Sequence, residues 1–131
     1  KLTKTHWDKN AALSFLTIIV DSPAGLGRVI RDANGKVIGI VEEKDATESQ
    51  KKIQEINPAC YIFELVFLKK YLGKIKKSEI TGEYYLTSLI DIAIKNNEKI
   101  EAVMGGKILW CGINTPEELK EAERLFLAVK N

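Results

Sequence analysis

A glycine-rich turn and an acidic run are the first features of this sequence whose residue types and spacing suggest ligand binding. Gly25 and Gly27 lie between two β-rich runs, and glycine lets a backbone N–H group approach a ligand closely. Glu42 opens the acidic run 42–45 just past an expected strand, where α/β sheets place ligand contacts. Each feature also has a plainer interpretation, a tight turn without a ligand and a solvated charge run.

Amide and hydroxyl side chains form a second group of candidates. Asn57 can donate to and accept from a sugar hydroxyl or acetamido group, or it can simply make the turn into the next strand. Asn114 precedes Thr115, which already supplies a helix cap, so the Asn114 amide is freer to bind a ligand. Tyr85 and Thr87 open an expected helix, and core packing is the alternative role for the tyrosine.

Histidine and cysteine chemistry is largely excluded. His6 is the single histidine, it lies in a polar segment typical of a surface residue, and no Gly-x-Ser-x-Gly elbow accompanies it. Cys60 and Cys111 are too widely separated for a zinc pattern and are expected to be reduced thiols in a cytoplasmic protein. A bound cation would therefore be a hard one such as magnesium, held by carboxylate, amide and substrate phosphate oxygens.

Length and composition indicate one globular domain. The chain has 131 residues, 45% of them hydrophobic and 29% charged, which is close to the average soluble domain. Its 20 basic and 18 acidic residues are mixed along the chain and leave a formal charge of +2, so nucleic-acid binding is not indicated. The longest apolar stretch, residues 13–20, is too short to span a membrane.

Alternating strand and helix patterns predict an α/β fold with three layers around a mixed, mostly parallel sheet. Asn34-Gly35 predicts a hairpin, and the spacings Thr47/Gln50 and Thr115/Glu118 predict two capping boxes. Strands are expected at 14–20, 28–31, 36–42, 59–63 and 99–104. Helices are expected at 6–12, 47–53, 67–75, 83–95 and from 115 onward, with an apolar face on the last formed by Leu119, Ala122, Leu125, Phe126 and Val129.

Five blocks in order resemble the sugar-1-phosphate nucleotidyltransferases, and within that family the uridylyltransferase domains. The resemblance covers residues 4–126, and its blocks are Gly25–Arg31, Asn34–Thr47, Gln54–Asn57, Gly82–Thr87 and Gly112–Leu119. It implies a Rossmann-like nucleotidyltransferase domain that binds UTP and N-acetylglucosamine 1-phosphate, releases pyrophosphate and forms UDP-N-acetylglucosamine for cell-wall precursors. Magnesium is the cofactor that the resemblance implies.

The same resemblance assigns roles to individual residues. It implies that the Gly27 backbone contacts the sugar, that Glu42 accepts from a sugar hydroxyl and that Asn57 reads the N-acetylglucosamine group. Tyr85 and Thr87 would lie near that pocket, and Asn114 matches the amide ligand to magnesium. No residue of this chain is assigned a catalytic acid–base role.

The resemblance also predicts what this chain lacks. Residues 1–131 correspond to the C-terminal, sugar-binding part of one nucleotidyltransferase domain, without its N-terminal nucleotide-binding half. We therefore expect this span alone to be inactive and to self-associate through an exposed sheet edge. The alternative is a non-catalytic sugar-phosphate-binding or interaction module of the same fold.

Overall fold

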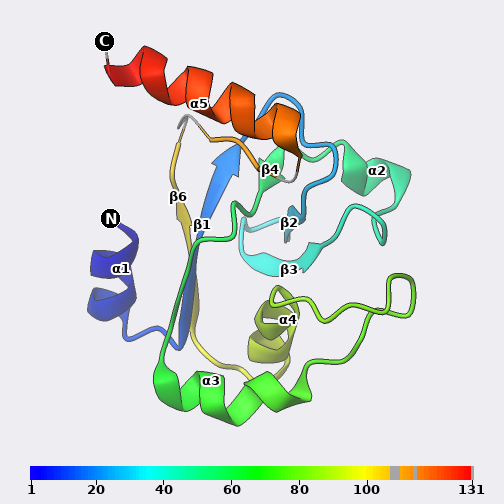
Figure 1. Ribbon diagram of the computed structural model, residues 1–131. Helices are drawn as coiled ribbons and strands as arrows, with labels where there is room; N and C mark the ends of the chain where they lie inside the picture. Colours follow the sequence, from blue (N-terminus) through cyan, green and yellow to red (C-terminus); the bar gives the residue numbers. More distant parts are fainter. Residues whose placement is uncertain (107–109, 114, 131) are drawn as a thin grey trace.

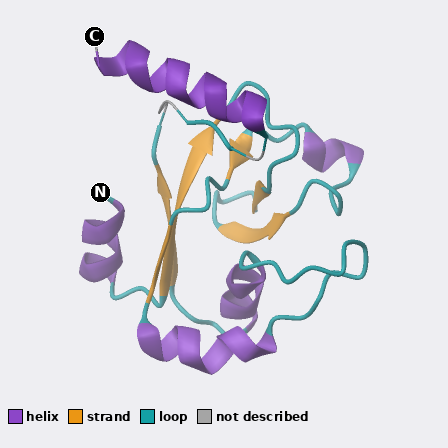
Figure 2. Cartoon of the chain, viewed as in Figure 1, coloured by secondary structure: helices purple, strands orange, loops and turns teal. Residues whose placement is uncertain are grey.

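A computed structural model describes residues 1–106, 110–113 and 115–130. Five α-helices and a 3-10 turn are found in these residues (Figures 1 and 2): α1 (Leu2–Lys9), α2 (Glu48–Lys51), α3 (Leu65–Tyr71), η1 (Leu72–Lys74), α4 (Ser88–Lys95) and α5 (Pro116–Lys130). The strands are β1 (Leu13–Ile19), β2 (Arg28–Arg31), β3 (Val37–Val41), β4 (Glu55–Ile56), β5 (Tyr61–Phe63) and β6 (Ile100–Met104). The predicted α/β class is confirmed.

The strands form one mixed sheet around β1. The strand order is β3-β2-β4-β1-β5, and β6 lies outside this order and also pairs with β1. Among the described residues, only the β1·β6 pairing is parallel, and the pairings of β1 with β4 and β5, and of β2 with β3 and β4, are antiparallel. The predicted mixed sheet is thus confirmed, but the predominance of parallel pairing is wrong. Short connections such as the β2–β3 hairpin allow only antiparallel neighbours.

Helices cover both faces of β1, as the three-layer prediction requires. Successive side chains of a strand point to opposite faces. Ser14 contacts His6 of α1 on one face, while Leu13 and Phe15 join the core with Leu89 of α4 on the other. Figure 1 shows α1 and α4 on opposite sides of the β1–β6 pair. β1 is therefore buried on both sides, which explains its continuous apolar sequence.

The predicted turn and caps are confirmed. The Asp32 side chain accepts hydrogen bonds from the backbone N–H groups of Asn34 and Lys36, each at 2.9 Å, and closes the hairpin between β2 and β3. Thr47 and Gln50 form a capping box at the start of α2. The Thr115 hydroxyl accepts from the Glu118 N–H at 3.2 Å at the start of α5, and the Glu118 carboxylate accepts in return from the Thr115 N–H.

Two helix positions and one additional strand are the main differences from the prediction. The first helix lies at 2–9 rather than 6–12, and the two-residue strand β4 is absent from the prediction. The helix expected at 83–95 begins only at Ser88. Tyr84 instead forms an antiparallel bridge with Lys77, and the Glu83 carbonyl accepts from the Ser78 N–H at 2.9 Å, so this backbone is committed to a loop.

His6 is buried, and the expectation of a surface histidine is wrong. Its side chain is 1% exposed, and its Nδ1 lies 2.8 Å from the Ser14 hydroxyl, which is also buried. Glu64 Oε1 lies 3.7 Å from the other ring nitrogen. Because neither the histidine nor the serine is open to solvent, this pair anchors α1 to β1 and cannot attack a substrate.

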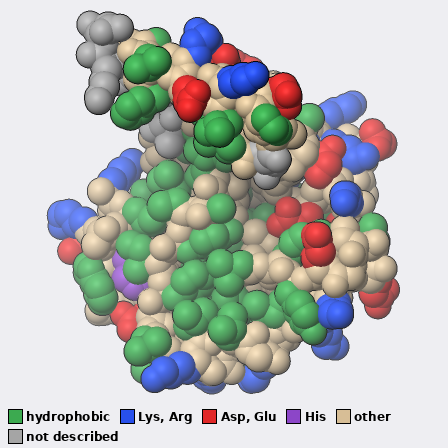
Figure 3. Space-filling model, in the orientation of Figure 1, with side chains coloured by type: hydrophobic (Ala, Val, Ile, Leu, Met, Phe, Trp, Pro, Cys, Tyr) green, Lys and Arg blue, Asp and Glu red, His purple; other side chains and the backbone are tan. Residues whose placement is uncertain are grey.

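The apolar face of α5 is largely open to solvent. Leu119 is 47% exposed and Phe126 is 61% exposed, and Figure 3 shows hydrophobic side chains along this helix at the surface.

None of the helices in the described ranges combines the length and apolar character that crossing a membrane requires.

Candidate functional site

The strand register brings three of the predicted site residues together. Arg28 is paired with Val41 of β3 and with Ile56 of β4. Gly27 immediately precedes β2, Glu42 immediately follows β3 and Asn57 immediately follows β4. Because both pairings are antiparallel, these three residues lie side by side at one end of the three strands. A hydrogen bond of 3.2 Å from the Asn57 N–H to the Gly27 carbonyl confirms that the segments stay together beyond the ladder.

The Glu42 carboxylate is fixed between a glycine and a threonine. Its Oε1 accepts a hydrogen bond of 2.7 Å from the hydroxyl of Thr87, which immediately precedes α4. Its Oε2 would lie 3.2 Å from a Cβ atom at position 27, so a side chain there would press on the carboxylate. The glycine is therefore needed for close approach, and the plainer interpretation of Glu42 as a solvated charge does not hold.

Asn57 makes a turn and also contacts a tyrosine. Its Oδ1 accepts from the Ala59 N–H at 3.1 Å, which confirms the turn, and its Nδ2 donates to the Tyr61 hydroxyl. Burial raises the pKa of Tyr61, the nearby negative charge of Glu42 raises it further, and the Asn57 hydrogen bond opposes both. The Tyr61 hydroxyl therefore stays protonated at neutral pH and can donate.

Tyr61 is the residue of this cluster that the sequence analysis misses. Its signal in the sequence is the alternation within 59–63, which places Tyr61 and Phe63 on one face of β5. The rings of these two residues stack with centroids 5.5 Å apart. That spacing alone indicates core packing, and only the fold places the hydroxyl beside Asn57.

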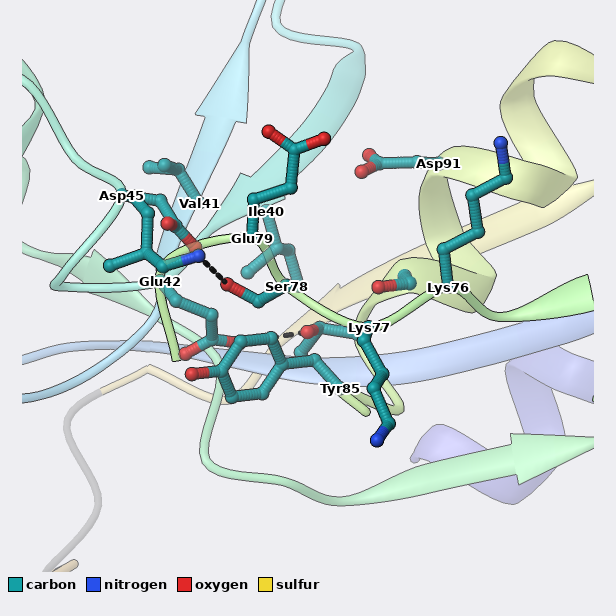
Figure 4. A pocket seen from close by; sticks show the side chains of 13 residues that line it. Ile40, Val41, Glu42, Asp45, Lys76, Lys77, Ser78, Glu79, Tyr85 and Asp91 are labelled. Atoms are coloured by element: carbon teal, nitrogen blue, oxygen red, sulfur yellow. Dashed lines mark hydrogen bonds between the residues drawn. The ribbon is translucent and has the colours of Figure 1, made fainter. Parts of the chain in front are cut away.

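A pocket with a volume of about 460 Å³ opens beside this cluster. Glu42, Tyr85 and Thr87 line one side of it, and residues 76–80 form another wall. Figure 4 shows the Glu42 side chain next to the Tyr85 ring, with Asp91 of α4 farther along the pocket. The volume lies in the usual range for small-molecule sites. Gly27 lies against Glu42 from the sheet, and neither Gly27 nor Asn57 is among the residues that line the pocket.

Tyr85 and Asp91 differ in how they are held. The Tyr85 hydroxyl donates to the Thr81 hydroxyl at 2.7 Å, which orients the ring against the pocket. Asp91 is half-buried, and burial raises its pKa, while the charge of Lys95 and a backbone hydrogen bond from Ile40 act in the opposite direction. Of the four carboxylates that line the pocket, Glu42 is thus fixed by a hydroxyl, and Asp91 lies in a less polar setting.

The magnesium prediction rests on a residue outside the part of the chain that the structure describes. Within 1–106, 110–113 and 115–130 no group of three or more His, Cys, Asp or Glu side chains could hold a metal ion. The predicted ligand Asn114 lies outside the described residues. Its neighbour Thr115 is engaged in the α5 cap, as predicted. A smaller pocket is lined by Gly25, Leu26 and the segment 110–112, which shortly precedes Asn114 in the sequence.

Comparison with known proteins supports the resemblance found in the sequence. The chain is 38% identical over 126 residues to the bifunctional protein GlmU of Caldanaerobacter subterraneus subsp. tengcongensis, covering 96% of this chain. It is 43% identical over 125 residues to GlmU of Caldicellulosiruptor saccharolyticus and 35% identical over 114 residues to GlmU of an Azoarcus species. The chain is therefore similar to one region of these GlmU proteins. It spans only 28% of the length of the first of these relatives.

No protein-family model matches the chain. The part of this chain that matches the first relative nevertheless includes all five sequence blocks of the resemblance, because the match covers 96% of this chain. In the structure, blocks that are distant in sequence converge on Glu42, which contacts Thr87 45 residues away. This convergence is what a shared binding site requires.

Proposed function

We propose that this chain is part of a sugar-1-phosphate nucleotidyltransferase, equivalent to the sugar-binding part of the uridylyltransferase domain in a UDP-N-acetylglucosamine pyrophosphorylase/glucosamine-1-phosphate N-acetyltransferase. The observation that carries the proposal is the Glu42 carboxylate, bonded to Thr87 at 2.7 Å and facing the pocket beside Gly27. A fixed carboxylate with adjacent hydroxyl and amide groups suits a polyhydroxylated ligand.

The proposed reaction needs positioning more than acid–base chemistry. An oxygen of the N-acetylglucosamine 1-phosphate attacks the α-phosphorus of UTP, a new P–O bond forms, and the bond to the β-phosphate breaks to release pyrophosphate. Such transfers depend on alignment of the reactants and on neutralisation of charge. A site without an accessible histidine is therefore compatible with this chemistry.

Within this proposal each residue of the cluster has a defined role toward the sugar. Glu42 accepts from a sugar hydroxyl, and Thr87 holds the unused carboxylate oxygen in place. The Gly27 backbone contacts the sugar, and the lack of a Cβ atom at this position leaves room for the Glu42 carboxylate. Asn57 recognises the N-acetyl group with its amide oriented by Tyr61, and the Tyr85 ring forms a wall of the pocket.

Magnesium and the nucleotide complete the proposal. We propose that Asn114 supplies an amide oxygen to Mg²⁺ that arrives with the substrate phosphates, which would offset their negative charge. The UTP site belongs in this proposal to an N-terminal half outside this chain, so residues 1–131 alone are expected to be inactive. The two free cysteines support a proposed location in the reducing cytoplasm.

Calorimetry with N-acetylglucosamine 1-phosphate tests the sugar site in this chain as it stands. The unmodified chain should bind the sugar phosphate weakly, and UTP should not bind measurably. Glu42→Gln should weaken sugar-phosphate binding roughly 10- to 150-fold, because a hydrogen bond to a charged group is worth about 1.5–3 kcal/mol. Glu48→Gln, on the surface of α2, is the matched control and should bind like the unmodified chain.

Two results would contradict these assignments. Equal binding by Glu42→Gln and the control would remove Glu42 from the site. Tight UTP binding would show that the nucleotide site lies within this chain. The same measurements with and without Mg²⁺, repeated for Asn114→Ala in a version that contains the nucleotide half, test the metal assignment.

We also propose that the chain forms homo-oligomers through a free sheet edge. In the described residues, β3, β5 and β6 each have only one strand neighbour. Such edges offer unpaired backbone groups to a second copy. Light scattering should therefore give a mass above 14.7 kDa, and a monomer at all concentrations would contradict the proposal.

A further inference from the structure

Arg28, the first residue of β2, is the largest fully buried side chain in the described part of the molecule. It is 1% exposed. Removing a guanidinium from water carries a large cost unless the charge is paired and its N–H groups find acceptors. Such a residue on the edge of a proposed binding site calls for a specific set of partners.

Three segments supply partners for the two terminal nitrogens of Arg28. One terminal nitrogen of Arg28 donates to the Leu26 carbonyl in the glycine turn. The other donates to the Lys51 carbonyl at 3.2 Å, at the end of α2, and lies 2.6 Å from Glu43 Oε2, just after β3. The hydrogen bond and charge of Arg28 hold the pKa of Glu43 below its usual range. One planar group thus ties the glycine turn, the end of β3 and α2 together.

The contacts of Arg28 fall on the immediate neighbours of the site residues. Leu26 precedes Gly27, and Glu43 follows Glu42. Gly27 and Glu42 lie close together, because a Cβ atom built at position 27 would be only 3.2 Å from Glu42 Oε2. Their relative position therefore sets the shape of the site. A group that fixes both neighbours therefore fixes the distance between the glycine backbone and the carboxylate.

We propose that Arg28 is a positioning residue that sets Gly27 and Glu42 for sugar-phosphate binding by holding Leu26 and Glu43 on one guanidinium. This inference rests on the proposed function. Lysine cannot replace arginine in this role, because an ammonium is a compact point charge that lacks the planar fork needed to reach acceptors in three directions.

Arg31 provides a matched control on the same strand. It is three residues farther along β2 and makes a bidentate pair with Glu55 of β4, at 2.8 and 2.6 Å. Its contacts are an ion pair of the same kind but do not include the glycine turn or the residues next to Glu42. Arg28→Lys and Arg31→Lys therefore remove the same type of fork from opposite ends of one strand.

Hydrogen exchange and calorimetry on the full 131-residue chain test the proposal. Arg28→Lys should accelerate amide exchange at least tenfold in 25–27 and 42–45 while exchange in β1 stays unchanged, and it should weaken binding of N-acetylglucosamine 1-phosphate at least tenfold. Arg31→Lys should change both quantities at the site less than twofold. If Arg28→Lys does not fold, Glu43→Gln decides, because it frees the end of β3 and leaves the two carbonyl contacts of Arg28 intact.

The proposal is wrong if Arg28→Lys, or Glu43→Gln in its place, matches Arg31→Lys in local exchange. It is also wrong if the turn loosens but sugar-phosphate affinity is unchanged. Failure of the proposed function is a separate result, since the unmodified chain would then bind no sugar phosphate. Exchange in 25–27 and 42–45 would in that case still decide whether Arg28 positions Gly27 and Glu42.

Discussion

Gly27→Ala should weaken sugar-phosphate binding while leaving the stability of the fold nearly unchanged. A Cβ atom at position 27 would lie 3.2 Å from Glu42 Oε2 and 3.2 Å from Ile40 Cγ2, closer than nine in ten real Cβ contacts. Glu42 cannot simply swing away, because the Thr87 hydroxyl holds its other oxygen at 2.7 Å. The new methyl group therefore shifts the carboxylate by a few tenths of an ångström and disturbs its hydrogen bonding to the ligand.

The expected magnitudes of the two effects are different. Losing one hydrogen bond to a charged group costs about 1.5–3 kcal/mol, which is a roughly 10- to 150-fold loss of affinity. For folding, replacing glycine by alanine stabilises by about 0.4–1 kcal/mol because the unfolded chain has fewer conformations. The close contacts with Glu42 and Ile40 oppose this gain, so the free energy of unfolding should change by less than about 1 kcal/mol.

Gly25→Ala is the control, two residues away in the same turn. Gly25 has a φ of +78° and open space around its Cβ position, so alanine there is strained without touching Glu42. We expect it to lower the free energy of unfolding by about 1–2 kcal/mol. Urea unfolding measures the stability of the two variants, and calorimetry with N-acetylglucosamine 1-phosphate measures their affinity. Wild-type affinity in Gly27→Ala, or a larger stability loss than in Gly25→Ala, would refute the reasoning.

Three further predictions concern the core, a titratable group and a cap. Leu89→Ala should lower the free energy of unfolding by about 2–5 kcal/mol in urea, because Leu89 of α4 is fully buried in the core; a loss below about 1 kcal/mol would contradict this packing. Burial raises the pKa of Asp91 in the folded state above its ordinary value of 3.8, so the ionised carboxylate destabilises the fold at neutral pH. Asp91→Asn should therefore have a higher urea midpoint at pH 7, with the advantage vanishing below about pH 3.8, and a lower midpoint at pH 7 would contradict the sign. Thr115→Ala should cost about 1 kcal/mol and accelerate amide exchange in the first turn of α5, since the Thr115 hydroxyl accepts from the Glu118 N–H; unchanged exchange there would show that the cap is not needed.

Local signals in the sequence predicted the elements that local chemistry controls. The hairpin between β2 and β3 follows from Asn34-Gly35, and both capping boxes follow from side chains three residues apart. Boundaries failed where distant contacts decide. The backbone at 83–87 continues a helical apolar pattern, but its bridge from Tyr84 to Lys77 holds it in a loop.

The candidate residues were named from the sequence, and their mutual arrangement was not. Glu42, Asn57 and Tyr85 each had a plain alternative role. The order of their sequence blocks along the chain, which resembles that of a known family, favoured the binding role instead. Tyr61 went unnoticed because its spacing with Phe63 is that of an ordinary core strand. Arg28 went unnoticed as well, since nothing local shows that a charged residue after Gly27 is buried.

By itself, therefore, the sequence determined the α/β class, the turns and caps, and the set of polar residues available for binding. These features depend on interactions between residues within a few positions of each other, so they can be predicted from the order of residues in the sequence. Tertiary structure alone decided the antiparallel pairings of β1 with β4 and β5, the burial of His6 and Arg28, and the contact between Glu42 and Thr87. Those features arise when β2, β3 and β4 align in register and α4 packs beside them. They are stabilised by contacts between residues that are far apart in the sequence.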